Sequence, residues 1–153
     1  VSYIIDEIGG GFNDDIKAIQ VGGPLGGIVP VNILKTLTLD FEDFSEKGFL
    51  LGHASFVCIP KSFSAVEYAK HLFAFTAHES CGKCFPCRLG TTRGKEMLES
   101  ALEDDIKFSE ELIHDLLQTM EVGSLCALGG GLPLAIKNLL EHCSDEFKPL
   151  MEK

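Results

Sequence analysis

The chain has 153 residues, of which 45% are hydrophobic, and a formal net charge of −10. This length allows one ordinary domain or two small ones, and the apolar content is normal for a chain that buries a core. The acidic balance, without any basic tract, argues against a nucleic-acid partner, because phosphate contact needs clustered lysine and arginine. The sequence lacks an apolar run of membrane-spanning length and an N-terminal signal peptide, so we expect no direct membrane insertion.

Residues 1–60 are predicted to form a small β-rich domain. Three short apolar runs, at 16–21, 28–34 and 54–59, are separated by glycines at 9–11, 22–27 and 48. Apolar runs of this length, bounded by glycine, are typical of strands joined by turns. We therefore expect strands in the three runs, with one short helix in this part of the chain.

Residues 61–153 carry instead the period of amphipathic helices. Ser64 with Glu67 forms a capping box and predicts the start of a first helix. Ser109, followed by two glutamates, predicts the start of a third. A second helix is expected to begin near Gly90, and a fourth at Pro133, since proline suits the first turn. The residues expected on the buried faces are Val66, Ala69, Phe73 and Thr76, then Met97, Leu98, Ala101 and Leu102, then Leu112, Ile113, Leu116, Leu117 and Met120, and finally Ile136, Leu139, Leu140 and Cys143.

Four amphipathic helices with short connections predict a small bundle. The expected fold class is therefore α+β, with a small β domain over residues 1–60 followed by a four-helix bundle over residues 61–153.

Three of the six cysteines, Cys81, Cys84 and Cys87, fall within seven residues. Cysteines this close cannot bridge one another without strain, and secreted disulfide scaffolds spread theirs along the chain. The distribution therefore indicates a metal centre in a reducing compartment, the cytoplasm or the inner face of a membrane complex. Cysteines at i, i+3 and i+6 allow one tight loop to reach three irons of a 4Fe–4S cluster.

The fourth ligand must come from a distant part of the chain, because the position that the bacterial ferredoxin pattern would use is Thr91. Cys126 is the first candidate, since its glycine-rich segment can bring backbone N–H groups close to cluster sulfur. Cys143 ranks second and Cys58 third. Cys143 lies on the apolar face of a predicted helix and Cys58 in an apolar strand-like run, and a buried free cysteine is ordinary in both settings.

Four basic residues and no acidic residue lie between Cys81 and Lys95. Lys83 and Arg88 are nearest to the cysteines, and we expect them in the surroundings of the cluster, where cations favour the reduced form. The alternative is a structural zinc-binding module for protein interaction, with His78 completing a Cys3His site. Successive intervals of three residues favour iron–sulfur, because zinc usually uses two separated ligand pairs.

No catalytic residue and no nucleotide or flavin site is predicted. The glycines at 22–27 lack the G-x-G-x-x-G spacing and a following helix. The segment GTTRGK at 90–95 is one residue short of a phosphate loop, and Glu96 stands where serine or threonine would bind magnesium.

The segments ESCGKCFPCRLG at 79–90 and SLCALG at 124–129 resemble a known family. They look like the C-terminal part of the NADH- and FMN-binding flavoprotein subunit of respiratory complex I, with relatives in NAD-linked formate dehydrogenases and hydrogenases. In that family the three clustered cysteines and the cysteine of the later segment ligate one 4Fe–4S cluster. The resemblance thus implies Cys81, Cys84, Cys87 and Cys126 as ligands. Residues 1–60 are similar, more loosely, to the β-grasp domain that precedes the cluster domain.

The resemblance implies electron transfer through that cluster in an NADH-linked oxidoreductase, from NADH to FMN, to the cluster and on to further iron–sulfur subunits. The family's FMN and NADH domain has no counterpart in these 153 residues. We therefore expect that this chain alone binds neither cofactor, and whether it is an enzyme stays open. The implied partners are the FMN/NADH domain, a 2Fe–2S thioredoxin-like subunit and a larger iron–sulfur subunit.

Overall fold

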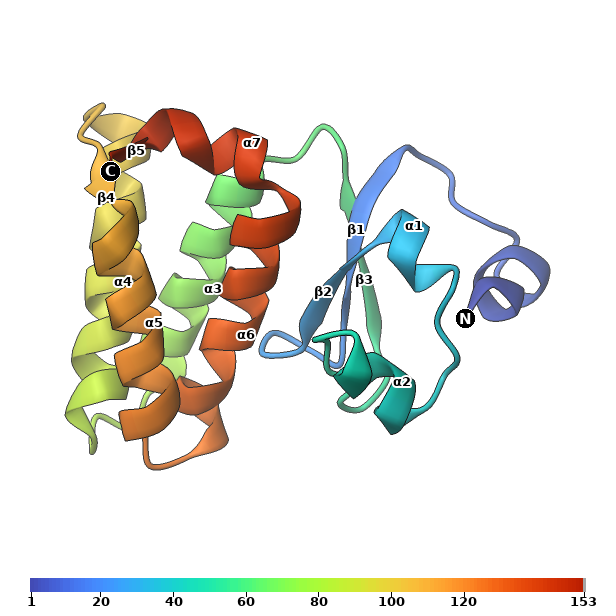
Figure 1. Cartoon of the computed structure of the whole chain (residues 1–153), viewed down its shortest axis with the longest axis horizontal. Helices are drawn as coiled ribbons and strands as arrows, with labels where there is room; N and C mark the ends of the chain where they lie inside the picture. The colour runs from blue at the N-terminus through green and yellow to red at the C-terminus, as the bar shows by residue number, and fades with distance from the viewer. Residues whose placement is uncertain (153) are drawn as a thin grey trace. The chain divides into compact units, whose positions relative to one another are not determined.

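A change from strands to helices divides the computed structural model, which describes residues 1–152, into two units (Figure 1). The first unit is Val1–Phe63 and the second begins at Ser64. The expected mixture of helices and strands is confirmed. In the part of the chain that is described, no helix is both long and apolar enough to cross a bilayer.

The first unit is built on a three-stranded sheet. Its strands are β1 (Ile16–Val21), β2 (Gly27–Pro30) and β3 (Phe56–Pro60), in the order β2-β1-β3 with both pairings antiparallel. In the central strand, Ile19 lies opposite Val29 of one neighbour and Cys58 of the other. Each of the three apolar runs therefore contributes a strand.

Short helices account for more of this unit than expected. The apolar run at 28–34 changes from β2 to helix α1 (Val31–Leu34) after Pro30, which has no N–H to continue a sheet. A short π-helix, η1 (Ile4–Ile8), and helix α2 (Phe41–Glu46) are also present. The expectation of one short helix was wrong. A local cap stabilises the start of α2, where the Asp40 side chain accepts a hydrogen bond from the Asp43 N–H at 2.7 Å.

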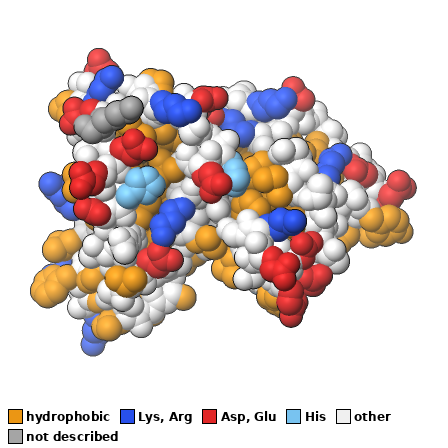
Figure 2. Space-filling model, in the orientation of Figure 1, with side chains coloured by type: hydrophobic (Ala, Val, Ile, Leu, Met, Phe, Trp, Pro, Cys, Tyr) orange, Lys and Arg blue, Asp and Glu red, His pale blue; other side chains and the backbone are white. Residues whose placement is uncertain are grey.

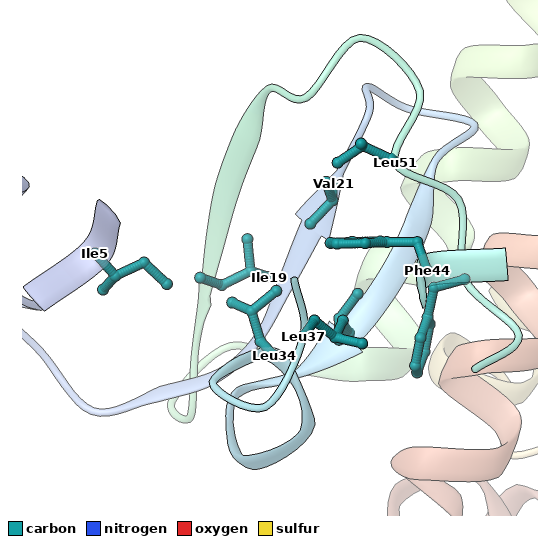
Figure 3. Close-up of a cluster of buried hydrophobic side chains, with 9 residues drawn as sticks. Ile5, Ile19, Val21, Leu34, Leu37, Phe44 and Leu51 are labelled. Carbon is teal, nitrogen blue, oxygen red and sulfur yellow. The ribbon is translucent and has the colours of Figure 1, made fainter. Parts of the chain in front are cut away.

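Side chains from the sheet and from these short helices form the core of the first unit (Figure 3). The buried residues are Ile5, Ile19, Val21, Val29, Leu34, Leu37, Phe44, Phe49 and Leu51. Phe44 of α2 and Leu34 of α1 are fully buried against strand residues, so burial stabilises helices that are too short to persist alone.

Four long helices dominate the second unit and pack side by side (Figure 1). They are α3 (Ala65–Glu79), α4 (Phe85–Glu103), α5 (Glu110–Gly123) and α6 (Ala127–His142). The short elements α7 (Ser144–Phe147) and η2 (Lys148–Leu150) follow, and β4 (Phe108–Ser109) pairs in parallel with β5 (Met151–Glu152). Two predicted starts are confirmed: Ser64 Oγ accepts from the Glu67 N–H and Ser109 Oγ from the Leu112 N–H, each at 3.3 Å.

Two other predicted helix starts were wrong, and both errors fall at the cysteines. Helix α4 begins at Phe85 rather than near Gly90, because Pro86 fits the first turn of a helix. Helix α6 begins at Ala127 rather than at Pro133, which lies inside the helix. The glycines before Pro133 are thus helical, although glycine costs about 1 kcal/mol in a helix relative to alanine. Close packing, described below, accounts for Gly129.

Of the residues predicted to face the core of the four long helices, all but one are buried or half-buried. All four residues chosen on α3 are buried, as are Leu98 and Ala101 of α4. Ile113, Leu117 and Met120 of α5 and Ile136 and Leu139 of α6 are also buried. Leu112 is 55% exposed, so its assignment to the core was wrong, and the remaining residues of the prediction are half-buried.

Candidate metal centre

One end of the second unit brings the two cysteine-bearing segments together. There α3 ends, α4 begins, α5 ends and α6 begins (Figure 1). Cys84 is the residue that immediately precedes α4, and Cys126 immediately precedes α6. Cys81 lies in the short connection between α3 and α4, and Cys87 in the first turn of α4.

Hydrogen bonds to Cys84 tie these segments to each other. The backbone N–H of Leu125, next to Cys126, donates to Cys84 Sγ and is the main cause of a lowered pKa of that thiol. The backbone N–H of Cys87 lowers the pKa further, against the opposing effect of burial. The segment around Cys126 therefore already contacts the first cysteine group, across some forty residues of sequence.

Cys87 is the most buried of the cysteines, at 4% exposure. Its Sγ lies 3.4 Å from Ser80 Oγ. A Cβ placed on Gly129, in the first turn of α6, would stand 2.6 Å from Cys87 Cβ and 3.0 Å from its Sγ. Only glycine therefore fits at position 129 without displacing this cysteine, and this explains a glycine inside a helix.

The N-termini of two helices lie in this region. The first bonds within the helices run from the Arg88 N–H to Cys84 O at 3.0 Å and from the Gly130 N–H to Cys126 O at 3.1 Å. The N–H groups before these have no acceptor inside their helix. Neither first turn contains an acidic residue. Partial positive charge from both helix dipoles therefore favours an anion here.

The basic residues near the cysteines fall into two groups. Arg93 and Lys95 pair with Glu96 and Glu99, at 2.6 Å and 3.7 Å. Arg88 donates instead to the Gly82 carbonyl at 3.3 Å, with its guanidinium 4.9 Å from the centre of the Phe85 ring, and Lys83 is exposed. Gly82 has a φ of +74°, which its lack of a side chain permits as the connection reverses.

The residues present fit an iron–sulfur cluster. Four thiol side chains are the donor set that such clusters use. Within residues 1–152, Ser124 Oγ is a buried oxygen without a hydrogen-bond partner. It would lie 2.6 Å from the same hypothetical Cβ on Gly129 that would crowd Cys87. An unpartnered polar atom beside a thiol indicates a site that accepts a polar group.

The alternative of a single zinc ion requires a tight grouping of donor atoms. Among the described residues, no three histidine, cysteine, aspartate or glutamate side chains are grouped as a single ion requires. A zinc ion holds its donors about 2.0–2.3 Å away, whereas the thiolates of a 4Fe–4S cluster bind different irons and lie farther apart. The His78 ring, proposed above as a zinc ligand, is exposed and contacts Glu79 Oε1 at 3.0 Å.

The lower-ranked cysteines lie elsewhere. Cys143 follows the end of α6, whose 16 residues separate it from Cys126 by about 24 Å. Cys58 lies in β3 of the first unit and is exposed, so its expected burial was wrong. Sequence reasoning missed Ser80, Ser124 and Gly129, although Ser80 directly precedes Cys81 and Ser124 stands two residues before Cys126.

Exposed hydrophobic side chains surround the same end of the helices. Phe85, Leu89, Val122 and Leu125 are each more than half exposed. Figure 2 shows hydrophobic side chains gathered at the lower left, over the end where α4 begins and α5 ends. We call these four residues the apolar rim. Exposed apolar groups of this kind typically mark contact with another chain or domain.

The chain is similar to part of several longer proteins that are named as subunits of oxidoreductases or hydrogenases. It is 33% identical over 141 residues to the F 1 subunit of NADH-quinone oxidoreductase of Rhizobium meliloti, covering 92% of this chain and 32% of that protein. It is 31% identical to NADP-reducing hydrogenase subunit HndC of Solidesulfovibrio fructosivorans, covering 95% of this chain and 30% of that protein. The mitochondrial NADH-ubiquinone oxidoreductase 51 kDa subunit of Neurospora crassa is 29% identical, over 98% of this chain and 31% of that protein.

A solved structure shares the fold. The crystal structure of an NAD+-reducing [NiFe]-hydrogenase in the H2-reduced state matches with a TM-score of 0.75 and 24% identity, over 91% of this chain and 24% of that chain. The chain thus spans about a third or less of the length of these proteins. The family model described as "NADH-ubiquinone oxidoreductase-F iron-sulfur binding region" matches residues 67–149, which include both cysteine segments. Since that match covers more than half of the chain, the chain belongs to this iron–sulfur-binding family.

Proposed function

We propose that this chain holds one 4Fe–4S cluster through Cys81, Cys84, Cys87 and Cys126 and carries single electrons in an NADH-linked oxidoreductase. The observation that carries the proposal is the close packing of the two cysteine segments at the starts of α4 and α6, where a Cβ on Gly129 would stand 2.6 Å from Cys87 Cβ. The effect of the Leu125 N–H on the pKa of Cys84 agrees with this proximity. Both segments lie inside the stretch that the iron–sulfur family model matches. Relatives named as NADH-quinone oxidoreductase and hydrogenase subunits support the electron-transfer role.

Each part of the site has a role in binding. The four thiolates hold the irons, and the dipoles and N–H groups of two helix N-termini stabilise the negative charge that thiolates and sulfide bring. Gly82 and Gly129 keep the backbone close without a side chain in the way. When bound, the cluster supplies a one-electron redox centre, and the protein sets its potential and position.

Lys83 and Arg88 are proposed to favour the reduced cluster. Reduction adds a negative charge, and a nearby cation lowers the free energy of the reduced form more than that of the oxidised form. Arg88 is held close to the cysteine loop by the Gly82 carbonyl and the Phe85 ring. Its charge is therefore less free to move away than that of an unrestrained side chain.

The parent assembly is proposed from the relatives and the apolar rim. Because the relatives are about three times longer, we place FMN and NADH in another domain of the same subunit, not in this chain. The partners proposed are that FMN/NADH domain, a 2Fe–2S thioredoxin-like subunit and a larger iron–sulfur subunit, in the cytoplasm or at the inner face of a membrane complex. The apolar rim offers such a partner a contact surface at the metal centre.

The two units are proposed to be separate domains, divided between Phe63 and Ser64, close to the expected boundary after residue 60. The first would be a β-grasp-like domain, supported by its sheet and covering helices. The second would be a four-helix bundle that carries the cluster at one end, supported by the side-by-side packing of α3 to α6.

The proposal is tested by replacing single cysteines. Cys126→Ser is expected to abolish or severely reduce cluster content, because it removes one of four ligands. Cys58→Ser is the matched control, since Cys58 is a free cysteine in the first unit. Iron and acid-labile sulfide are measured on anaerobically purified protein. An unaffected Cys126→Ser protein would contradict the ligand set, and zinc without labile sulfide in the unmodified protein would favour the structural zinc module.

A further inference from the structure

Two serine hydroxyls lie near Cys87. Ser80, directly after α3, places its Oγ 3.4 Å from Cys87 Sγ, a normal separation for a hydrogen bond to sulfur. Ser124 lies directly after α5. A Cβ placed on Gly129 would stand 2.6 Å from Ser124 Oγ and 3.0 Å from Cys87 Sγ, so both atoms border the same point. The most buried ligand cysteine thus has two hydroxyl groups in its surroundings.

The hydrogen-bond pattern decides which atom donates between Ser80 and Cys87. The Gly82 N–H donates to Ser80 Oγ at 3.2 Å, so this oxygen already acts as an acceptor there. The one hydroxyl hydrogen of Ser80 remains free to be donated. A cysteine that ligates iron is a thiolate and has no hydrogen. The hydrogen between these two atoms must therefore come from Ser80.

Ser124 independently indicates that the occupied site contains an acceptor for a hydroxyl hydrogen. Its Oγ is buried and has no hydrogen-bond partner among residues 1–152. A buried hydroxyl without a partner is costly, and native proteins usually provide one. A sulfur of the bound cluster or of its cysteines would supply the missing acceptor.

We infer that the Ser80 hydroxyl donates a hydrogen bond to Cys87 Sγ and, with Ser124, makes one-electron reduction of the cluster more favourable, an inference that rests on the proposed function. A donor next to sulfur stabilises the more negative, reduced state. Reduction by an external one-electron donor, dithionite in the test below, makes and breaks no bond, and the hydroxyl proton stays on Ser80 Oγ. Ser80 and Ser124 are thus positioning residues that set the potential.

The test is a redox titration of the cluster-loaded chain, with iron and labile sulfide measured on each sample. Ser80→Ala is expected to lower the ratio of reduced to oxidised cluster about tenfold at a fixed ambient potential, which equals 59 mV for a one-electron couple. Ser80→Thr keeps the hydroxyl and should restore the ratio. Ser100→Ala is the control, a half-buried serine far along α4.

The sign of the shift separates this role from a purely structural one. If Ser80 only held the loop through Gly82, its loss would let water in, which favours the reduced form and raises the potential. Pulsed electron paramagnetic resonance gives a second readout, because the Ser80 hydroxyl hydrogen should appear as an exchangeable coupling that deuterium oxide removes. This signal should be absent in Ser80→Ala.

If the Ser80→Ala protein does not bind the cluster, Ser124→Ala keeps the test decisive. This substitution removes no hydrogen bond within the described chain, because Ser124 Oγ makes none there. It should also lower the ratio, by a smaller factor. A loaded Ser80→Ala protein with an unchanged or raised potential overturns the inference, as does an unshifted Ser124→Ala if Ser80→Ala carries no cluster. Unmodified protein without iron and sulfide would instead refute the proposed function.

Discussion

A side chain at position 129 would compete with cysteine sulfur for the same space. The ideal Cβ position lies 2.6 Å from both Cys87 Cβ and Ser124 Oγ, well inside van der Waals contact. At the next position, Gly130, the nearest atom to such a Cβ is Glu121 O at 3.5 Å, an ordinary contact. Two adjacent glycines of the same helix therefore differ in whether the site depends on them.

Gly129→Ala and Gly130→Ala form a matched pair, because alanine gains about 1 kcal/mol of helix propensity over glycine at either position. We expect Gly130→Ala to be neutral or stabilising with normal iron content. Gly129→Ala should lose about 1–3 kcal/mol to overpacking and bind less iron, because Cys87 must move. Urea unfolding of the metal-free proteins and iron analysis measure both effects. Equal iron contents in the two variants would contradict the assignment of Cys87.

At the scale of helices, two glycines allow α4 to pack closely against its neighbours. Gly90 and Gly94 lie four residues apart on one face of this helix. A Cβ on Gly94 would stand 2.2–2.5 Å from three atoms of the Phe73 ring of α3. A Cβ on Gly90 would stand 2.7 Å from Met120 Cγ and 2.8 Å from Met120 Sδ of α5. Helix α4 thus approaches α3 and α5 closely. The side chain that it meets on α3 is a rigid ring, whereas the one on α5 is a flexible methionine.

Gly94→Ala is expected to destabilise the metal-free protein by about 1–3 kcal/mol, because the fully buried Phe73 ring cannot bend away. Gly90→Ala should cost less, since methionine has three rotatable bonds and adapts its shape. Urea unfolding midpoints compare the two variants directly. The double variant Gly94→Ala with Phe73→Leu should recover part of the loss, as contacting residues are coupled. Equal losses for the two single variants would rule out this explanation.

At the scale of the whole molecule, the metal centre belongs to one unit only. All four proposed ligands lie in the second unit, whereas the core of the first unit contains no residue after 63. A ligand stabilises only the structure that binds it, by a free energy that grows with the logarithm of ligand concentration over Kd. The cluster should therefore stabilise the second unit and leave the first unchanged.

Removal of the cluster by a chelator under reducing conditions tests this separation. Amide hydrogen exchange should speed up in the first turns of α4 and α6, because their N–H groups lose the anion that they face. Exchange in β1 should keep its rate, and this strand serves as the internal control. A comparable loss of protection in β1 would show that the two units are one cooperative domain.

Local pattern alone determined much of the second unit. Ser64 and Ser109 cap the helices that they were predicted to start, because an N-cap bond spans only three residues and is encoded locally. The spacing of Cys81, Cys84 and Cys87 indicated a metal centre for the same reason, since one short loop supplies three ligands. Membership of the iron–sulfur family is likewise confirmed, because its motifs are contiguous in sequence.

Only the tertiary structure decided where the helices at the site begin and what surrounds the cysteines. Local propensity predicts a loop at Gly129 and a helix start at Pro133, yet both residues lie inside α6, where the close contact of Gly129 with Cys87 outweighs the propensity cost of glycine. Ser80 and Ser124 are far apart in sequence, and both lie near Cys87 only because α3 and α5 end at the same place. Hydrogen bonds within a turn are encoded locally, whereas contacts between distant segments depend on how whole helices pack.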